Sequence, residues 1–131
     1  MKALIVEDEF TSRVVMHKLL SPYGECHIAV NGREAVEVFA QALDEGEPYD
    51  LICLDIRMPE MDGFEVLREI RRIEEKKGIV GPHWVKIIMV TAVNEPRSIM
   101  QAFSSQCEAY LLKPIEREKL LVHLRNFGLL S

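Results

Sequence analysis

Short apolar runs recur along the chain, separated by longer stretches in which apolar and polar residues mix. Five such runs are three to five residues long, at 3–6, 26–30, 51–54, 87–90 and 110–112. Continuous apolar runs of this length are typical of strands in a parallel sheet, because both faces of the sheet are buried. The second run, which is interrupted by His27, has the weakest pattern. We therefore predict five buried strands.

Each run is followed by a stretch whose apolar residues lie three or four positions apart, which is the period of an amphipathic helix. In the first helix Val15 and Leu19 form this pattern, flanked by Met16 and Leu20, until Ser21-Pro22-Tyr23-Gly24 ends it. The apolar positions of the next four helices are Ala35, Phe39, Ala42 and Leu43; Phe64, Leu67, Ile70 and Ile73; Ile99 and Phe103; and Leu120, Leu121, Leu124 and Phe127.

Two of the helix starts carry a capping signal. Asn31 is followed by Glu34, and Asp62 by Glu65, each at the three-residue spacing of a capping box. The fourth helix, at about residues 95–105, has the weakest pattern. Strand and helix alternate five times, so the sequence predicts an α/β fold with a doubly wound, five-stranded parallel sheet and helices on both faces.

The connection before the fourth strand is long. Residues 74–84, which end at the only tryptophan, Trp84, contain two glycines and a proline. A helix-to-strand connection usually takes about 2–6 residues. We predict a loop that follows a frayed helix end. The Trp84 ring would either cover the sheet edge or contact a partner.

Composition restricts the class of protein. The 131 residues suit one domain, and we expect residues 1–131 to be that domain, with no output domain attached. No run approaches the roughly 18 apolar residues of a membrane helix, and no signal-peptide pattern is present. The net charge of −5 argues against direct binding of nucleic acid. Three cysteines without disulfide or zinc spacing indicate a reducing cytoplasm.

Polar residues that could bind a ligand or take part in a reaction follow four of the predicted strands. The first, third, fourth and fifth apolar runs stop at Glu7-Asp8, Asp55, Thr91 and Lys113. In a doubly wound sheet the binding crevice lies outside the carboxyl ends of the strands, where the strand order reverses. An acid pair, an acid, a hydroxyl and a lysine at this edge form a set that can hold a divalent cation and a phosphoryl group.

Three carboxylates in one crevice need a neutralising partner. Two carboxylates about 4 Å apart repel by roughly 4 kcal/mol at an effective dielectric of about 20, so a proton or a cation must join them. Mg²⁺ suits such an all-oxygen site because it keeps several waters and shares phosphate oxygens. A carboxylate can also accept a phosphoryl group, with Lys113 and Thr91 as candidates to neutralise the phosphoryl oxygens.

Each of these residues has a simpler explanation when taken alone. An acid after a strand can cap the next helix, a lysine before a proline can be a solvated turn residue, and a strand-end threonine can bond the backbone. We expect Asp62 to be a helix cap rather than a ligand, and Tyr110 alone would be an ordinary strand aromatic. The functional interpretation depends on their joint occurrence in this chain order.

Four motifs extend that interpretation to a family. They are Val6-Glu7-Asp8, Leu54-Asp55-Ile56-Arg57-Met58-Pro59-Glu60-Met61-Asp62-Gly63, Val90-Thr91-Ala92 and Tyr110-Leu111-Leu112-Lys113-Pro114. With them the chain resembles, from end to end, the receiver domain of response regulators, the phosphoacceptor module of two-component signalling. The second motif is highly specific. The resemblance implies a flavodoxin-like fold.

The resemblance also implies a role for each acidic residue. Asp55 would accept the phosphoryl group from the phosphohistidine of a histidine kinase or of a histidine phosphotransfer protein. Asp8, Asp55 and the backbone carbonyl of Arg57 would ligate Mg²⁺, and Glu7 would occupy the second acidic position.

The remaining matches would form a switch. Lys113, joined to Pro114 by a cis bond, would pair with the phosphoryl oxygens, and Thr91 and Tyr110 would be the switch pair. Drawing Thr91 inward would leave space for Tyr110 and alter the face formed by the fourth helix, the last strand and the last helix. The exposed candidates on that face are Arg97, Gln101, Glu108, Lys119 and His123.

The chain departs from the family pattern at one turn and in the length of two segments. Gln106, followed by Cys107, replaces the glycine usual before the final strand, so the turn there must close without a residue that tolerates positive φ. The second helix and the loop before the fourth strand are also lengthened. Neither feature touches the acceptor motif, so both bear on partner surfaces.

The predicted function is therefore a phosphorylation switch that binds a downstream target protein. It would not be an enzyme in the usual sense, since it would catalyse only its own phosphotransfer and slow autodephosphorylation. An intermediate carrier in a phosphorelay is the alternative. A Mg²⁺-dependent phosphohydrolase with an aspartate nucleophile would need an acid where Arg57 stands. A flavodoxin-type electron carrier would need a Ser/Thr-Gly-rich phosphate loop after the first strand.

Overall fold

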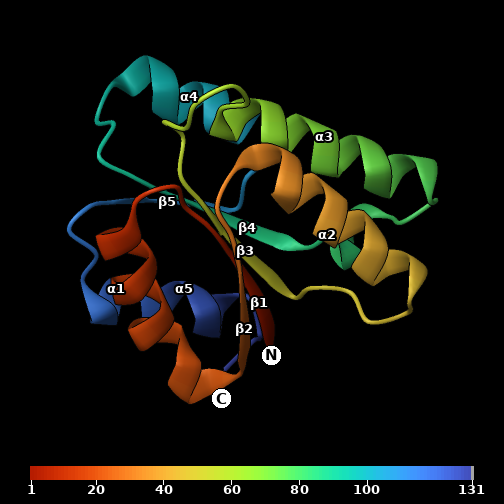
Figure 1. Cartoon of the computed structure of the whole chain (residues 1–131), viewed down its shortest axis with the longest axis horizontal. Coiled ribbons are helices and arrows are strands. Elements are labelled where there is room, and N and C mark those ends of the chain that lie inside the picture. The colour runs from red at the N-terminus through yellow and green to blue at the C-terminus, as the bar shows by residue number, and fades with distance from the viewer. Residues whose placement is uncertain (131) are drawn as a thin grey trace.

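The computed structural model describes residues 1–130, and a single five-stranded sheet forms its centre (Figure 1). All strand pairs are parallel, in the order β2-β1-β3-β4-β5. The strands are β1 (Lys2–Val6), β2 (Glu25–Ala29), β3 (Leu51–Leu54), β4 (Lys86–Thr91) and β5 (Ala109–Leu112). The predicted doubly wound α/β fold is confirmed, with strand bounds within one residue of those expected.

Helices cover both faces of this sheet. They are α1 (Phe10–Leu20), α2 (Gly32–Asp44), α3 (Gly63–Lys76), α4 (Pro96–Ser104) and α5 (Arg117–Asn126), with short 3-10 turns η1 (Ser21–Tyr23) and η2 (Gly81–His83). In Figure 1, α2, α3 and α4 lie on one side of the sheet and α1 and α5 on the other. Among the described residues, no helix has the length and apolar character that crossing a membrane requires.

The inner strands feed two separate cores. Leu4 and Val6 of β1 pack into the core beneath α2, α3 and α4, whereas Ala3 and Ile5 pack into the core beneath α1 and α5. Because both faces are covered, the inner strands read as uninterrupted apolar runs. β2 is an edge strand, and its Ile28 is 40% exposed, which explains its weaker pattern.

Two helices turn a different face to the core from the one predicted. In α1 the buried residues are Met16 and Leu20, while Val15 is 43% exposed. In α4 only Ala102 is buried, and Phe103 is 48% exposed. Both helices carry apolar residues on more than one side, so spacing alone does not select the inner face. The prediction that Val15 and Phe103 belong to the apolar faces that pack on the core is therefore wrong.

The predicted N-caps are confirmed for α2 and α3. Asn31 Oδ1 accepts the N–H of Glu34 at 2.8 Å, and Asp62 Oδ1 accepts that of Glu65 at 3.0 Å. Each bond satisfies one of the free N–H groups of a helix start. The N-cap of α1 is Glu9, so neither acid of the pair before it occupies the capping position.

The turn between α4 and β5 closes on a residue with a side chain, where the family pattern has a glycine. Gln106 itself adopts the left-handed conformation, with φ of 74°. Such a conformation costs a residue with a side chain roughly 1–2 kcal/mol relative to the right-handed one. The turn thus closes without a residue that tolerates positive φ, as expected, and Gln106 carries the backbone strain itself.

The long connection starts later than predicted. α3 continues to Lys76, and Glu74, expected in a frayed end, is 1% exposed. The Trp84 indole N–H donates to the Ile79 carbonyl at 2.9 Å, and the Arg71 guanidinium lies 4.9 Å from the ring centroid. Trp84 therefore covers a buried cation in front of β4, which is an inner strand, and does not cover the sheet edge.

Candidate functional site

The carboxyl ends of the strands border an open cleft of about 520 Å³. It lies where the strand order reverses, between β1 and β3, as expected for a doubly wound sheet. The lining residues are Glu7, Asp8, Glu9, Ser12, Asp55, Arg57, Thr91, Ala92 and Lys113. The structure thus brings together all the predicted site residues except Tyr110. Tyr110 lies within β5, before Lys113, and does not line the cleft.

The three carboxylates converge as predicted. Glu7, Asp8 and Asp55 each present an oxygen, and these oxygens lie within 4.8 Å of one another. Glu7 and Asp55 are buried, whereas Asp8 is exposed. The backbone explains this convergence, because the N–H of Glu7 bonds to Ala29 and that of Asp55 to Val6, both at 3.1 Å. These bonds extend the sheet ladder to the acids.

The lysine reaches both buried acids. Lys113 Nζ donates to Asp55 Oδ2 at 2.9 Å and also to Glu7 Oε1. Its backbone N–H bonds to the Thr91 carbonyl at 2.9 Å, which ties the end of β5 to that of β4. The bond between Lys113 and Pro114 is cis, as the resemblance implies.

The electrostatics of the cluster favour a cation. Burial raises the pKa of Glu7 to about 7, and the charge of Asp55 acts in the same direction against the opposing bond from Lys113. Burial lowers the pKa of Lys113, but its bonds to Glu7 and Asp55 outweigh this, so the pKa lies above its ordinary value and the ammonium stays charged. Three acids against one lysine leave excess negative charge, and an all-oxygen donor set fits Mg²⁺.

The two predicted switch residues share one backbone partner. Thr91, 1% exposed, accepts the N–H of Val93 on Oγ1 at 3.3 Å. The Tyr110 hydroxyl donates to the Val93 carbonyl at 2.7 Å. Val93 is buried in the loop between β4 and α4. It therefore connects the hydroxyl in the cleft to the aromatic ring on β5.

One functional candidate was missed at the sequence level. Arg13 Nη1 donates to the carbonyl oxygens of Asp8 at 2.9 Å and Glu7 at 3.3 Å, so it braces the loop that carries the acid pair. A cation close to the start of a helix is unfavourable for the helix dipole. That unfavourable placement in α1 was the available signal.

One predicted member of the output face is misplaced. Glu108 is not an exposed residue, since its side chain is 22% exposed and pairs with Arg71 at 2.9 Å. It also accepts the N–H of Ile87 at 2.6 Å. Arg97, Gln101 and Lys119 are exposed, as expected, and His123 is partly buried.

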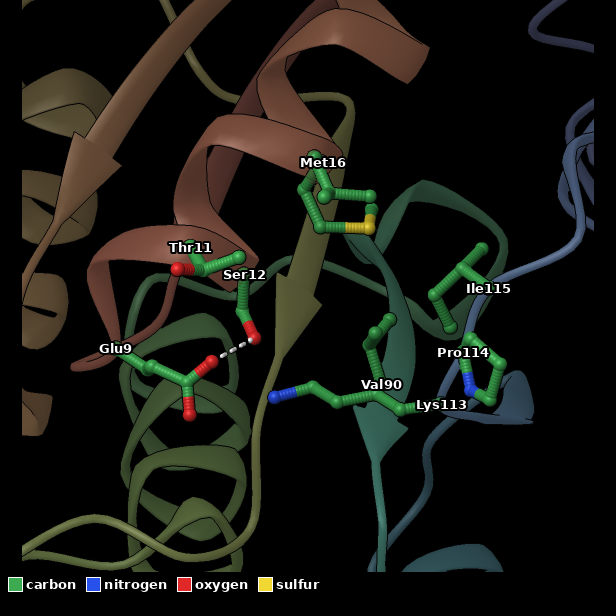
Figure 2. Close-up of a pocket in the computed structure, with 9 residues that line it drawn as sticks. Glu9, Thr11, Ser12, Met16, Val90, Lys113, Pro114 and Ile115 are labelled. Carbon is green, nitrogen blue, oxygen red and sulfur yellow. Dashed lines mark hydrogen bonds between the residues drawn. The ribbon is translucent and has the colours of Figure 1, made fainter.

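A second, more apolar pocket of about 400 Å³ adjoins the cleft, between α1 and the segment after β5 (Figure 2). Val15, Met16, Val90, Pro114 and Ile115 contribute its apolar lining. Glu9, Ser12 and Lys113 line both this pocket and the cleft, and Ser12 Oγ donates to Glu9 Oε1 at 3.0 Å. The pocket and the cleft therefore share part of their lining.

Comparison with known proteins agrees with the site. The family model described as the response regulator receiver domain matches residues 3–125. Probable histidine kinase 2 of Oryza sativa subsp. indica is 32% identical over 92% of this chain and 12% of its own length. Hybrid signal transduction histidine kinase L of Dictyostelium discoideum is 33% identical over 97% of this chain and 7% of its own length. The chain thus spans about a tenth of these relatives.

Solved structures with the same fold are also receiver domains. The receiver domain of a histidine kinase from Arabidopsis thaliana, complexed with Mg²⁺ and BeF₃⁻, superposes with a TM-score of 0.83 at 29% identity, covering 97% of this chain and 89% of the other. That of a sensor histidine kinase from Pseudomonas aeruginosa, with magnesium coordinated in the active site cleft, gives 0.78 at 28% identity, covering 96% and 95%. The chain therefore belongs to the response regulator receiver domain family, whose members act as phosphoacceptors in two-component signalling and phosphorelays.

Proposed function

We propose that Asp55 is the phosphoacceptor and that the reaction depends on Mg²⁺. The observation that carries this proposal is the pairing of Asp55 Oδ2 with Lys113 Nζ at 2.9 Å inside a cleft lined by three carboxylates. In the proposed site Asp8, Asp55 and the backbone carbonyl of Arg57 hold the metal, and Glu7 is the second acid. When bound, Mg²⁺ neutralises the carboxylates and the incoming phosphoryl oxygens.

The proposed reaction moves a phosphoryl group between two nucleophiles. A bond forms between an Asp55 carboxylate oxygen and phosphorus, while the bond from phosphorus to the donor's histidine nitrogen breaks. Lys113 is already beside the acceptor, so its ammonium can pair with a phosphoryl oxygen with little movement. The Thr91 hydroxyl lines the same cleft and can donate a hydrogen bond to another phosphoryl oxygen.

The donor would be a histidine kinase or a histidine phosphotransfer protein. The matched relatives are histidine kinases, which supports a partner of this class. Free thiols at Cys26, Cys53 and Cys107 are consistent with the cytoplasm as the compartment.

Output would follow from the Val93 connection. If Thr91 turns toward a phosphoryl group, its bond to the Val93 N–H is lost, and the loop that also holds the Tyr110 hydroxyl is released. The affected face contains α4, β5 and α5. It exposes Met100 at 70%, Leu112 at 40% and Val122 at 49%, an apolar set suited to a protein target.

The second candidate function is an intermediate carrier in a phosphorelay. The observation that favours it is that the matched relatives include a hybrid histidine kinase, of which this chain matches a short part. A carrier passes the group from Asp55 on to another histidine, whereas an effector keeps it long enough to bind its target.

Phosphotransfer from a labelled histidine phosphotransfer protein tests both functions. The proposal predicts transfer of label to this chain with Mg²⁺ and little transfer with EDTA; equal transfer under both conditions contradicts the metal requirement. The isolated phosphorylated chain is then mixed with unlabelled phosphotransfer protein. Fast return of label indicates a carrier, and slow return indicates an effector.

A further inference from the structure

Four helices end in the same pattern, with a residue of left-handed conformation just beyond the helix. In α2, α3 and α5 that residue is a glycine, with φ of 73° at Gly46, 73° at Gly78 and 76° at Gly128. In α4 it is Gln106, at 74°. In each case its N–H and the next N–H bond back to carbonyls of the helix. α4 therefore uses the common helix end with a residue that disfavours it.

A buried arginine grips the carbonyl of this residue. Arg71 Nε and Nη2 both donate to the Gln106 carbonyl oxygen, at 3.0 and 2.8 Å. Arg71 belongs to α3, 35 positions earlier in the chain, and is 6% exposed. Two hydrogen bonds from one buried guanidinium hold the Gln106 peptide in the orientation that the left-handed conformation requires.

The remaining donors of Arg71 are also used. Nη1 donates to Glu74 Oε1 at 2.7 Å and to the Val85 carbonyl at 2.9 Å, and Nη2 donates to Glu108 at 2.9 Å. All five N–H groups of the guanidinium thus have an acceptor. With the Trp84 ring 4.9 Å away, the guanidinium is fixed between α3, the start of β4 and the start of β5.

The opposite end of α4 is held more loosely. Its N-cap, Glu95, makes no side-chain capping bond, and residues 94–97 are all exposed. Just before it lies Val93, the residue bonded to Thr91 and Tyr110. At the far end, Ala102 is buried, and Cys107, also buried, bonds back to its carbonyl at 3.1 Å.

We propose that Arg71 is a positioning residue that pins the C-terminal end of α4. Phosphorylation then moves α4 by its N-terminal end, about a fixed point at Gln106, and the start of β5 stays in place. This inference rests on the proposed phosphorylation switch and adds to it the direction in which α4 moves. Glycine avoids the strain of the left-handed conformation at the other helix ends. At the end of α4 the hydrogen bonds from Arg71 offset that strain, and they also join α4 to α3.

A double-mutant cycle tests the support that Arg71 gives to Gln106. Arg71→Lys keeps the charge but loses the planar set of five donors. Gln106→Gly removes the backbone strain. In urea unfolding, Arg71→Lys should lower the folding equilibrium constant of the parent about tenfold or more. In the Gln106→Gly background the same substitution should lower that constant by a factor that is several-fold smaller. Equal losses in both backgrounds overturn the proposal.

The location of the fixed point is tested in the parent protein, so it does not depend on any variant folding. With Mg²⁺ and beryllofluoride, a stand-in for the phosphoryl group, amide shifts should be large over residues 92–99 and small over residues 104–108. In Arg71→Lys the shifts should spread to residues 104–109. Equal shifts at both ends of α4 in the parent overturn the pin, as does an unchanged profile in a folded Arg71→Lys.

The same spectra separate this inference from the proposed function. Amide shifts at Asp55, Thr91 and Lys113 report that beryllofluoride has bound. If these are absent in the parent, the proposed phosphoacceptor function fails, and the pin fails with it. If they are present while α4 shifts uniformly, only the pin is refuted.

Discussion

Asp8 differs from the other two acids because it is exposed and lies at the open side of the cleft. Glu7 and Asp55 are both bound by Lys113, so their charges are partly balanced within the protein. The charge of Asp8 is therefore the one most available to an incoming cation. The three acids of the cleft therefore differ in whether Lys113 already pairs with them.

Asp8→Asn should weaken Mg²⁺ binding at least tenfold and slow phosphorylation with it. The reason is that losing one of three carboxylates removes more than about 1.4 kcal/mol of attraction for the cation. It should also raise the free energy of unfolding of the metal-free protein slightly, by relieving repulsion. Calorimetric titration with Mg²⁺ measures the affinity, with Glu45→Gln, an exposed acid on the C-cap of α2, as control. Unchanged affinity in Asp8→Asn would mean that Asp8 is not a ligand.

Thr91→Ala should separate phosphorylation from its consequence. The variant keeps the three acids and Lys113, so it should still take a phosphoryl group on Asp55. It lacks the hydroxyl that, in the proposed switch, would exchange Val93 for the phosphoryl group, so the amide shifts over residues 94–99 after beryllofluoride should shrink. Thr91→Ser, which retains the hydroxyl, should restore much of the response. Shifts in Thr91→Ala equal to those of the parent would show that the threonine does not carry the switch.

Among the elements, the start of α3 lies directly against the backbone of Asp55 and Ile56. A Cβ built on Gly63 would lie 2.3 Å from the Asp55 carbonyl oxygen and 2.7 Å from the Ile56 Cα. These are backbone atoms, and the Gly63 N–H bonds to the Ile56 carbonyl at 2.8 Å. The glycine is therefore needed for close approach, and not for an unusual φ.

Gly63→Ala should destabilise the fold and slow phosphorylation together. The backbone must shift to admit the methyl group, at a cost of roughly 1–3 kcal/mol, and the shift displaces Asp55 from Lys113. The control is Gly81→Ala, because a Cβ on Gly81 meets nothing within 4 Å and should change stability by less than about 0.5 kcal/mol. Thermal unfolding and the initial rate of phosphorylation by acetyl phosphate measure the two effects. A variant with parental stability and rate would refute the role of close approach.

What the sequence predicted well follows from local patterns. The strands were predictable because burial on two faces leaves continuous apolar runs, and the caps Asn31 and Asp62 because their bonds span three residues. The inner faces of α1 and α4 were not, because apolar residues lie on more than one side of each helix. Gln106 was read only as a missing glycine, since its support comes from Arg71, 35 positions away.

The residues of the site likewise fall into those that the sequence could predict and those that it could not. Its acids, hydroxyl and lysine were predictable because each lies at or just after the end of a strand, and parallel strands bring their carboxyl ends together. Arg13 was missed because its bonds go to backbone carbonyls, which have no residue-type signature. The Val93 connection was equally hidden, since only the N–H and carbonyl of that residue take part.

Across the whole molecule, the strand order places the proposed phosphoacceptor site and the proposed switch residues on neighbouring strands. Glu7 and Asp55 follow the two central strands β1 and β3, while Thr91 and Tyr110 belong to β4 and β5 on one side of them. In the proposed switch, a change at Asp55 would reach the edge of the sheet through the ends of β4 and β5, and α4 and α5 border that edge. The path from the cleft to the proposed partner surface is therefore short.

Intact-mass measurement tests directly whether Asp55 accepts a phosphoryl group. After incubation with Mg²⁺ and acetyl phosphate, the parent should gain the mass of one phosphoryl group. Asp55→Asn, which keeps the size of the side chain but lacks the nucleophilic carboxylate, should gain none. Equal labelling of Asp55→Asn and the parent would show that Asp55 is not the acceptor.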